Sequence, residues 1–230
     1  MLEFTESQAQ IEAFSFFKGL SPGALQHAIA HVVTRHHPVD QVILLENDWG
    51  NSVYFILNGW VKVRTYNLEG KEVTLNILGK GEMFGEMASL DLITRSTDVI
   101  TLTEANIASL PAQDFMYLLE NEPMAGIRLA RLLARRLRQV NRRLRLREAD
   151  STSRVADVLL FLAEGQGVAS AEGISIPTLP HRELSSLSGL ARETVTRSLG
   201  KLEKKNLIRR NSESDQLWIL DINGLEALMV

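Results

Sequence analysis

The chain of 230 residues is 45% hydrophobic and 23% charged, an ordinary composition for one large or two smaller globular domains. Because it contains no cysteine, disulfides, thiolate metal sites, iron–sulfur clusters and cysteine nucleophiles are excluded. No apolar run approaches the length of a membrane span, and the first residues do not form a signal peptide, so we expect a cytoplasmic protein without membrane contact.

The net charge of −3 is unevenly distributed along the chain. Residues 1–124 carry 7 basic and 16 acidic side chains, whereas residues 125–150 carry 9 arginines and only 2 acidic side chains. Residues 151–230 are almost balanced, with 9 basic and 10 acidic side chains. An acidic block, a basic segment and a near-neutral block predict two domains joined by a distinctive connector.

The first third of the chain changes from helical to β-rich. Residues 6–33 favour helices interrupted by GLSPG, where Ser21 is placed to cap a helix that carries Pro22 at its first position. From about residue 34 to 111, short β-rich runs alternate with turn signals such as NDWGN, LNG and GKGE. Many short strands at close spacing predict a β-sandwich or barrel.

Within the β-rich part, the run FGEMASLDLITRSTD (84–98) raises a question about two charges. Glu86 follows a glycine, and Arg95 comes nine residues later, both in an apolar setting. Buried charges are costly unless each has a partner. The two side chains are therefore either a structural salt bridge or two halves of a ligand site.

After Pro111 the pattern is helical to about residue 149. A 4-3 spacing of small and apolar residues forms a heptad seam, which favours a helix paired with another helix. The expected dimer interface on this seam is Leu133, Leu137, Val140 and Leu144. The nine arginines beside the seam are interpreted as a solvated face that offsets the acidic block, with nucleic-acid or membrane binding as the alternatives.

The C-terminal block predicts a helix–turn–helix followed by a wing. HRELSSL is one helix, SGL is a turn containing Gly189, and ARETVTRSLGKLEKKN is a second helix. NLIRRNSESDQLWIL predicts a hairpin with a polar tip. On the second helix we expect an inward face of Leu190, Val195, Leu199 and Leu202, and an outward face of Arg192, Glu193, Thr196 and Arg197 near the end that reaches base edges.

The alternative for that outward face is ordinary surface charge. Glu193 and Arg197 are spaced for a helical ion pair, which is worth only about 0.2–0.5 kcal/mol. The preceding helix, the glycine turn and the predicted wing together favour base recognition.

A β-roll, a long helix and a winged helix–turn–helix in this order resemble the cyclic-AMP receptor and fumarate–nitrate regulator (CRP/FNR) superfamily of bacterial transcription regulators. ARETVTRSLGKLEKKNLI resembles the recognition helix of its cyclic-AMP receptor branch, and FGEM…TRST is similar to its phosphate-binding cassette. The resemblance covers nearly the whole chain. It implies an α+β fold with a cyclic-nucleotide-binding, jelly-roll-like β-roll (1–120), a long dimerisation helix (121–149) and a winged helix–turn–helix DNA-binding domain (150–230).

The resemblance also implies a function. It implies a homodimeric, non-enzymatic transcription regulator that is activated by cyclic AMP, binds a TGTGA-like inverted repeat in double-stranded DNA and works with RNA polymerase. No covalent cofactor and no metal are expected. The implied cyclic-nucleotide contacts are Gly85, Glu86, Met87, Arg95, Ser96, Gln139 and Asn141. The implied DNA contacts are His181, Arg192, Glu193, Thr194, Thr196, Arg197 and Lys201.

The chemistry of the cassette agrees with this assignment. A cyclic phosphate suits a guanidinium fork and a hydroxyl, and a ribose hydroxyl suits a fixed carboxylate acceptor. Gly85 allows the backbone to approach a ligand closely. The long helix departs from the family pattern, since it offers RQVNRR where cyclic-AMP binders place hydroxyl residues against adenine; the amides of Gln139 and Asn141 are possible substitutes.

Two alternatives and one further candidate site are left open by the residues. The roll of a family member can sense another metabolite such as 2-oxoglutarate, or nothing, although the carboxylate of Glu86 would repel a dicarboxylate. A cyclic-nucleotide-binding regulatory subunit with a protein partner would lack a helix–turn–helix. Among the five histidines, His27, His31, His36, His37 and His181, the adjacent pair in RHHP is a candidate for metal binding that we expect to be solvated.

Overall fold

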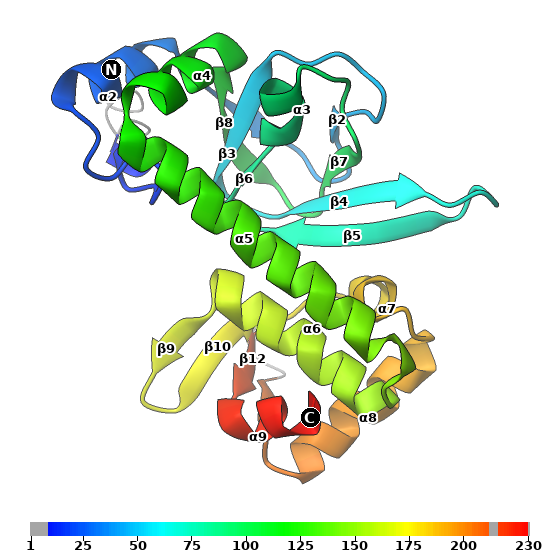
Figure 1. Ribbon diagram of the computed structural model, residues 1–230. Helices are drawn as coiled ribbons and strands as arrows, with labels where there is room; N and C mark the ends of the chain where they lie inside the picture. Colours follow the sequence, from blue (N-terminus) through cyan, green and yellow to red (C-terminus); the bar gives the residue numbers. More distant parts are fainter. Residues whose placement is uncertain (1–8, 212–215, 230) are drawn as a thin grey trace. The chain divides into compact units, whose positions relative to one another are not determined.

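The computed structural model describes residues 9–211 and 216–229 (Figure 1). The chain divides into two compact units, residues 1–134 and 135–230, and the boundary falls within the long helix α5 (Pro123–Arg145). Among the described residues, none of the helices combines the length and the apolar character that a membrane crossing requires.

Among the described residues, eight strands in two antiparallel sheets form the β-roll of the first unit. The first sheet has the order β1-β8-β3-β6 and the second the order β2-β7-β4-β5. A core that includes Ile56, Val61, Phe84 and Ile107 is drawn from both sheets, which confirms the predicted roll. The strands are β1 (Val33–His37), β2 (Val42–Leu44), β3 (Ser52–Asn58), β4 (Val61–Tyr66), β5 (Glu72–Leu78), β6 (Met83–Phe84), β7 (Asp98–Thr101) and β8 (Ala105–Pro111).

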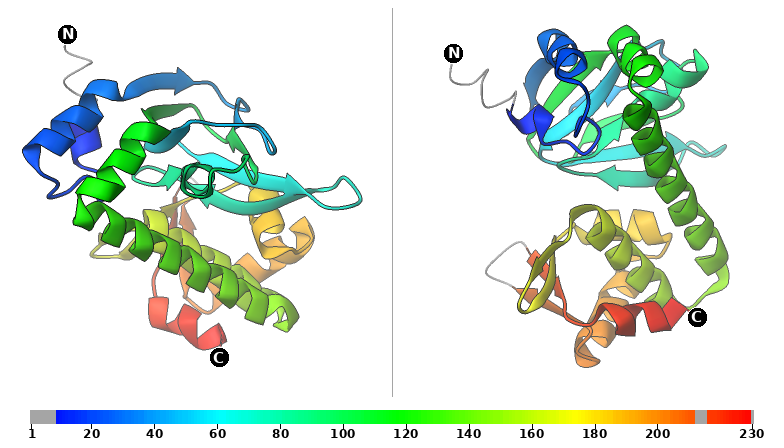
Figure 2. Two further views of the ribbon diagram at one scale, coloured as in Figure 1. Left: turned by 45° about the horizontal axis from the view of Figure 1, so that its top comes forward. Right: turned by 60° about the vertical axis from the view of Figure 1, so that its left-hand side comes forward.

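Helices of the first unit pack on the roll, and both views in Figure 2 show α2 (Pro22–His31) beside α4 (Ala112–Asn121). The predicted cap of α2 is confirmed, because the Ser21 side chain accepts a hydrogen bond from Ala24 N (3.3 Å) and Pro22 occupies the first turn. A second apolar core joins these helices and the start of α5 to the roll. Its aromatic members are Phe14, Phe16, Phe17, Phe55 and Phe115.

Two helical features of the first unit were not resolved by the sequence pattern. A short helix, α3 (Glu86–Asp91), lies within the β-rich part of the chain. The helical stretch after Pro111 is two helices, because α4 ends at Asn121 and Pro123 begins α5. Proline has no N–H to continue a helix but fits its first turn.

The second unit contains the predicted helix–turn–helix and wing. The strands β11 and β12 pair antiparallel as the wing, and its expected polar tip, 212–215, lies outside the described residues. Their sheet has the order β11-β12-β10-β9. The elements are η1 (Leu146–Glu148), α6 (Ser151–Gln166), β9 (Val168–Ser170), β10 (Gly173–Pro177), α7 (His181–Ser188), α8 (Arg192–Lys204), β11 (Ile208–Asn211), β12 (Gln216–Ile219), α9 (Ile222–Glu226) and η2 (Ala227–Met229).

A charged cluster joins the end of α5 to α6 within the second unit. Asp157 is 3% exposed and forms an ion pair with Arg142 Nε. Arg142 Nη1 also contacts Glu164 Oε1 (2.6 Å), and Arg143 Cζ lies 4.3 Å from the ring centroid of Phe161. The interpretation of all the arginines as a solvated face is therefore wrong for Arg142 and Arg143, since α6 presents a buried carboxylate and an aromatic ring to them.

Candidate ligand site and DNA interface

The cassette run places Glu86 and Arg95 in the interior of the first unit. Gly85 directly follows β6 and has φ +82°, a left-handed conformation that suits glycine, and α3 begins at the next residue. Glu86 is 2% exposed and Arg95 is 4% exposed. The prediction that these two charges are buried is confirmed.

Backbone and side-chain hydrogen bonds hold Arg95 in place. Its N–H donates to Asp48 O (2.8 Å), and its own carbonyl oxygen accepts from Asn47 N (2.8 Å). Asn47, in the NDWGN turn, has φ +69°, a left-handed conformation that asparagine tolerates. The guanidinium donates through Nη1 to Gly85 O (2.6 Å) and through Nη2 to Ser52 O (2.8 Å). The functional group is thus fixed by the backbone around it.

The surroundings of the guanidinium leave it buried and positively charged. Burial lowers the pKa of Arg95, while Tyr54 and the carboxylate of Glu86 act in the opposite direction. The Tyr54 ring centroid lies 5.8 Å from Arg95 Cζ. Among the described residues, Arg95 Nε is buried without a hydrogen-bond partner. A buried N–H without a partner costs roughly 1–3 kcal/mol, so this atom is suited to an anionic ligand.

Gly50 is a member of this site that the sequence interpretation missed. A Cβ at Gly50 would lie 2.1 Å from Arg95 Nε, so only glycine leaves the guanidinium where it is. Gly50 belongs to NDWGN, which was interpreted only as a turn signal. Hereafter the Arg95 site means Gly50, Ser52, Tyr54, Gly85, Glu86 and Arg95.

The part that the other predicted ligand contacts play at this site stays a prediction. Met87 is 49% exposed and Ser96 is also exposed. Gln139 and Asn141 belong to the second unit, where Gln139 Nε2 donates to Glu164 Oε2 (3.0 Å). Their contact with a base stays a prediction.

The turn of the helix–turn–helix is held by an arginine from α6. Gly189 has φ +65° and ends α7. Arg154 donates through Nε to Ser188 O (3.0 Å) and through Nη2 to Gly189 O (3.2 Å). These bonds satisfy carbonyl groups that the end of a helix leaves without partners. Arg154 therefore fixes the direction in which α8 starts.

The two faces of α8 separate as predicted. Val195, Leu199 and Leu202 are at most 1% exposed. The predicted DNA contacts Arg192, Glu193, Thr196, Arg197 and Lys201 are exposed, Thr194 and His181 are partly buried, and Leu190 of the preceding turn is only partly buried.

The predicted DNA-contacting side chains of α8 form hydrogen bonds with other residues of the helix–turn–helix. Arg197 donates to the Glu193 carbonyl oxygen (3.4 Å) and to Thr194 Oγ1 (3.2 Å). His181 Nδ1 lies 3.0 Å from Thr196 Oγ1, which itself donates to Arg192 O (3.0 Å). The histidine must therefore donate this bond. DNA contact by these side chains stays a prediction.

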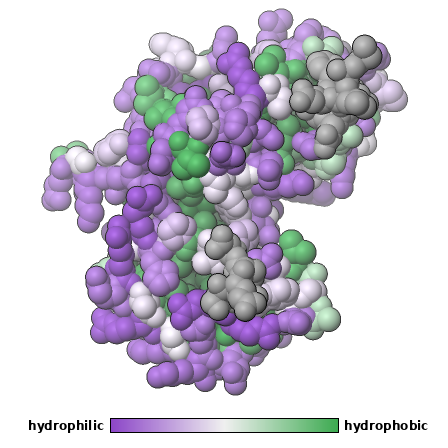
Figure 3. Space-filling model, turned by 180° about the vertical axis from the view of Figure 1, so that it is seen from behind, coloured by the Kyte–Doolittle hydropathy of each residue, from purple (hydrophilic) through white to green (hydrophobic). Residues whose placement is uncertain are grey.

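Three of the four predicted interface residues on α5 are exposed. Leu137 is 60%, Val140 50% and Leu144 56% exposed, whereas Leu133 is partly buried against the helical core of the first unit. The face of the molecule drawn in Figure 3, on the side opposite to the view of Figure 1, is mainly hydrophilic. A row of exposed apolar side chains at heptad spacing is suited to a partner helix.

Comparisons with known proteins match both units. Residues 34–122 match the family model of the cyclic nucleotide-binding domain, and residues 153–228 match that of the Crp-like helix-turn-helix domain. The chain is 34% identical to the cyclic AMP receptor protein of Thermus thermophilus, with 84% of this chain and 87% of that protein covered. It is 30% identical to a CRP-like cAMP-activated global transcriptional regulator of Mycobacterium tuberculosis, with 86% and 89% covered. The structure of FixK2 from Bradyrhizobium japonicum has the same fold, with a TM-score of 0.73, 18% identity, and 86% of this chain and 96% of that chain covered.

Proposed function

Because the chain belongs to the Crp family of cyclic-nucleotide-binding transcription regulators, which are not enzymes, we propose that it is a homodimer activated by cyclic AMP. In this proposal the activated dimer binds a TGTGA-like inverted repeat in DNA and works with RNA polymerase. Ligand binding shifts the population towards the DNA-binding state, because the two states differ in affinity for the ligand.

The proposal that cyclic AMP binds at the Arg95 site rests on one observation. Arg95 is buried, and among the described residues its Nε has no hydrogen-bond partner. A cyclic phosphate would accept from this N–H and neutralise the buried charge, and charge-assisted hydrogen bonds of this kind are the strong ones. From the resemblance to the family's cassette, we expect the Glu86 carboxylate to accept a hydrogen bond from the ribose 2′-hydroxyl. Two relatives named for cyclic AMP, from Thermus thermophilus and Mycobacterium tuberculosis, support the choice of nucleotide.

Gly50→Ala is expected to weaken cyclic AMP binding by displacing the Arg95 guanidinium, whose Nε would lie 2.1 Å from the new Cβ. Loss of one charge-assisted hydrogen bond corresponds to roughly tenfold to a hundredfold in affinity. Calorimetric titration measures the change. The matched control is Gly23→Ala, where a Cβ meets nothing within 4 Å. Equal affinity of the Gly50 and Gly23 variants would show that the guanidinium position is irrelevant to the ligand.

The choice of adenine as the base rests on the relatives rather than on the residues of α5. RQVNRR has no serine or threonine, and Gln139 is already bonded to Glu164. Titration with cyclic AMP, cyclic GMP and 2-oxoglutarate therefore tests the effector. Cyclic AMP is expected to bind best, and preferential binding of 2-oxoglutarate would assign the family's alternative effector class.

Leu137→Glu is expected to convert the dimer into a monomer. In a parallel pairing of α5 along the seam, two carboxylates would face each other in an apolar interface, which is strongly unfavourable. Sedimentation velocity measures the association state. Arg138→Glu changes the charge of an exposed side chain beside the seam and should leave the dimer intact. A dimer that survives Leu137→Glu would place the interface elsewhere.

Glu193→Ala is expected to relax the preference for one base pair in each half-site. A glutamate in the major groove accepts from cytosine N4, and one good base contact is worth about 1–3 kcal/mol of discrimination. Competition with duplexes changed at single positions measures this preference. As a control, Lys201→Ala should weaken all duplexes alike and reduce the salt dependence, as expected for a phosphate contact. A Glu193 variant that behaves like the Lys201 variant would exclude base recognition by Glu193.

A further inference from the structure

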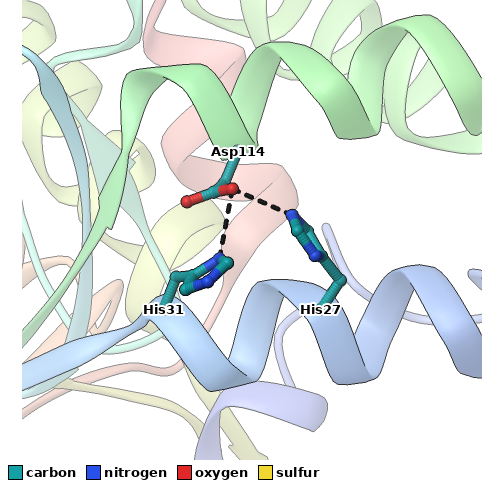
Figure 4. Close-up of side chains that lie close together, drawn as sticks. All are labelled: His27, His31 and Asp114. Atoms are coloured by element: carbon teal, nitrogen blue, oxygen red, sulfur yellow. Dashed lines mark hydrogen bonds and ion pairs between the residues drawn. The ribbon is translucent and has the colours of Figure 1, made fainter.

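His27, His31 and Asp114 lie close together, as Figure 4 shows, and both histidines are exposed. His27 Nε2 lies 2.9 Å and His31 Nδ1 lies 3.2 Å from the same oxygen, Asp114 Oδ1. The three ligand atoms all lie within 4.8 Å of one another. Among the described residues, no other three histidine and carboxylate side chains form such a group.

The cluster lies on two helices that are held at both ends. Ser21 N, at the start of α2, donates to the carboxylate of Glu122, directly after α4 (3.3 Å). His31, at the end of α2, contacts Asp114 in the first turn of α4. The helices therefore run antiparallel. Because His27 and His31 are four residues apart, both rings lie on the side of α2 that faces α4.

We propose that His27, His31 and Asp114 form a binding site for a divalent transition metal, with Zn²⁺ as the best-matched ion. Two imidazole nitrogens and one carboxylate oxygen are a usual ligand set for Zn²⁺, which keeps its remaining positions for water. With metal–ligand distances of about 2.0–2.2 Å, ligand atoms around a tetrahedral ion lie about 3.3 Å apart. The nitrogen–oxygen distances of 2.9 and 3.2 Å are already close to this value.

Metal binding requires little rearrangement of the three side chains. Both rings already direct a nitrogen at the carboxylate, and a nitrogen that binds a metal presents its lone pair, with the ring proton on the other nitrogen. Their side chains are 43% and 48% exposed, which gives an ion access from solvent. The nitrogen ligands favour Zn²⁺, Co²⁺ or Ni²⁺ over Mg²⁺ and Ca²⁺, which prefer oxygen.

The histidine pair in RHHP does not provide a comparable site. His36 Nδ1 lies 3.1 Å from Asn106 Oδ1, and His37 Nδ1 lies 2.9 Å from Gln41 Oε1. Neighbouring residues of a strand point to opposite faces, so these two rings cannot share an ion easily. This pair supplies the matched control for a test.

The test uses the untagged full-length protein after chelator treatment, titrated with Zn²⁺ against a chromogenic chelator. Wild type and His36→Gln/His37→Gln are expected to bind one Zn²⁺ per chain. His27→Gln/His31→Gln should bind Zn²⁺ at least about tenfold more weakly. Even the mutation of residues that only hydrogen-bond to metal ligands lowers metal affinity about 10–100-fold. Co²⁺ should give the visible spectrum of a low-coordinate site in wild type and in His36→Gln/His37→Gln, but not in His27→Gln/His31→Gln.

A stability readout complements the titration. A metal that joins α2 to α4 should raise the Tm by about 5 °C at a hundredfold excess over its Kd. Asp114→Asn should lose this rise while keeping the fold. The site is excluded if wild type binds no stoichiometric Zn²⁺, or if the His27/His31 variant binds it as wild type does. Neither result bears on the proposed function, because the test contains no nucleotide and no DNA.

Discussion

Arg95→Ala is expected to weaken cyclic AMP binding by about 2–5 kcal/mol, or roughly 30- to 5,000-fold, the usual cost of truncating one member of a buried charged pair. The variant removes the positive charge at the Arg95 site and the donor to the ligand. It also removes the hydrogen bonds to Gly85 O and Ser52 O, so the backbone there is less well ordered for binding.

Calorimetric titration of wild type and variant measures this loss. Arg35→Ala, which removes an exposed arginine of the same unit, should bind as wild type does. Glu86→Ala should weaken only ligands that carry a free 2′-hydroxyl, which a 2′-deoxy analogue distinguishes. If Arg95→Ala binds cyclic AMP as tightly as wild type does, the Arg95 site is not the ligand site.

Asp157→Ala is expected to lower the free energy of unfolding of the second unit by about 3–5 kcal/mol, because it leaves buried arginine charge without its carboxylate. Burial lowers the pKa of Arg143, and the negative charge of Asp157 raises it. The ion pair between Asp157 and Arg142 holds the end of α5 on α6. Its loss should therefore also loosen the end of α5.

Hydrogen–deuterium exchange along α5 and α6, with urea unfolding, measures both effects. Glu164→Ala is the matched control, because Glu164 pairs with the same Arg142 but its side chain is 40% exposed. An exposed pair is worth at most about 1 kcal/mol, so this variant should be nearly as stable as wild type. Equal losses in the two variants would show that burial of Asp157 does not matter.

The helix–turn–helix was predictable because its signals are local. Val195, Leu199 and Leu202 recur at helical spacing, and Gly189 marks a turn that needs a left-handed residue. Glu86 and Arg95 were predictable for a related reason, since both lie in one 15-residue run with an apolar setting.

Features that depend on distant residues were not predictable in this way. Gly50 matters because it packs against a side chain 45 positions later, and Asp114 meets histidines more than 80 positions earlier. Arg142 and Arg143 looked solvated because their partners, Asp157 and Phe161, lie on another helix. A periodic pattern identifies the buried face of a helix but not the residues that pack against its polar face.

In the proposed function, cyclic AMP at the Arg95 site controls recognition of an inverted DNA repeat by a dimer. The most direct test is a binding selection on random DNA duplexes at moderate salt, with and without cyclic AMP. We expect enrichment of two TGTGA-like half-sites with their centres about one helical turn, roughly 10 bp, apart, and only when cyclic AMP is present. Enrichment of an asymmetric site, of no site, or of the same site without cyclic AMP would contradict it.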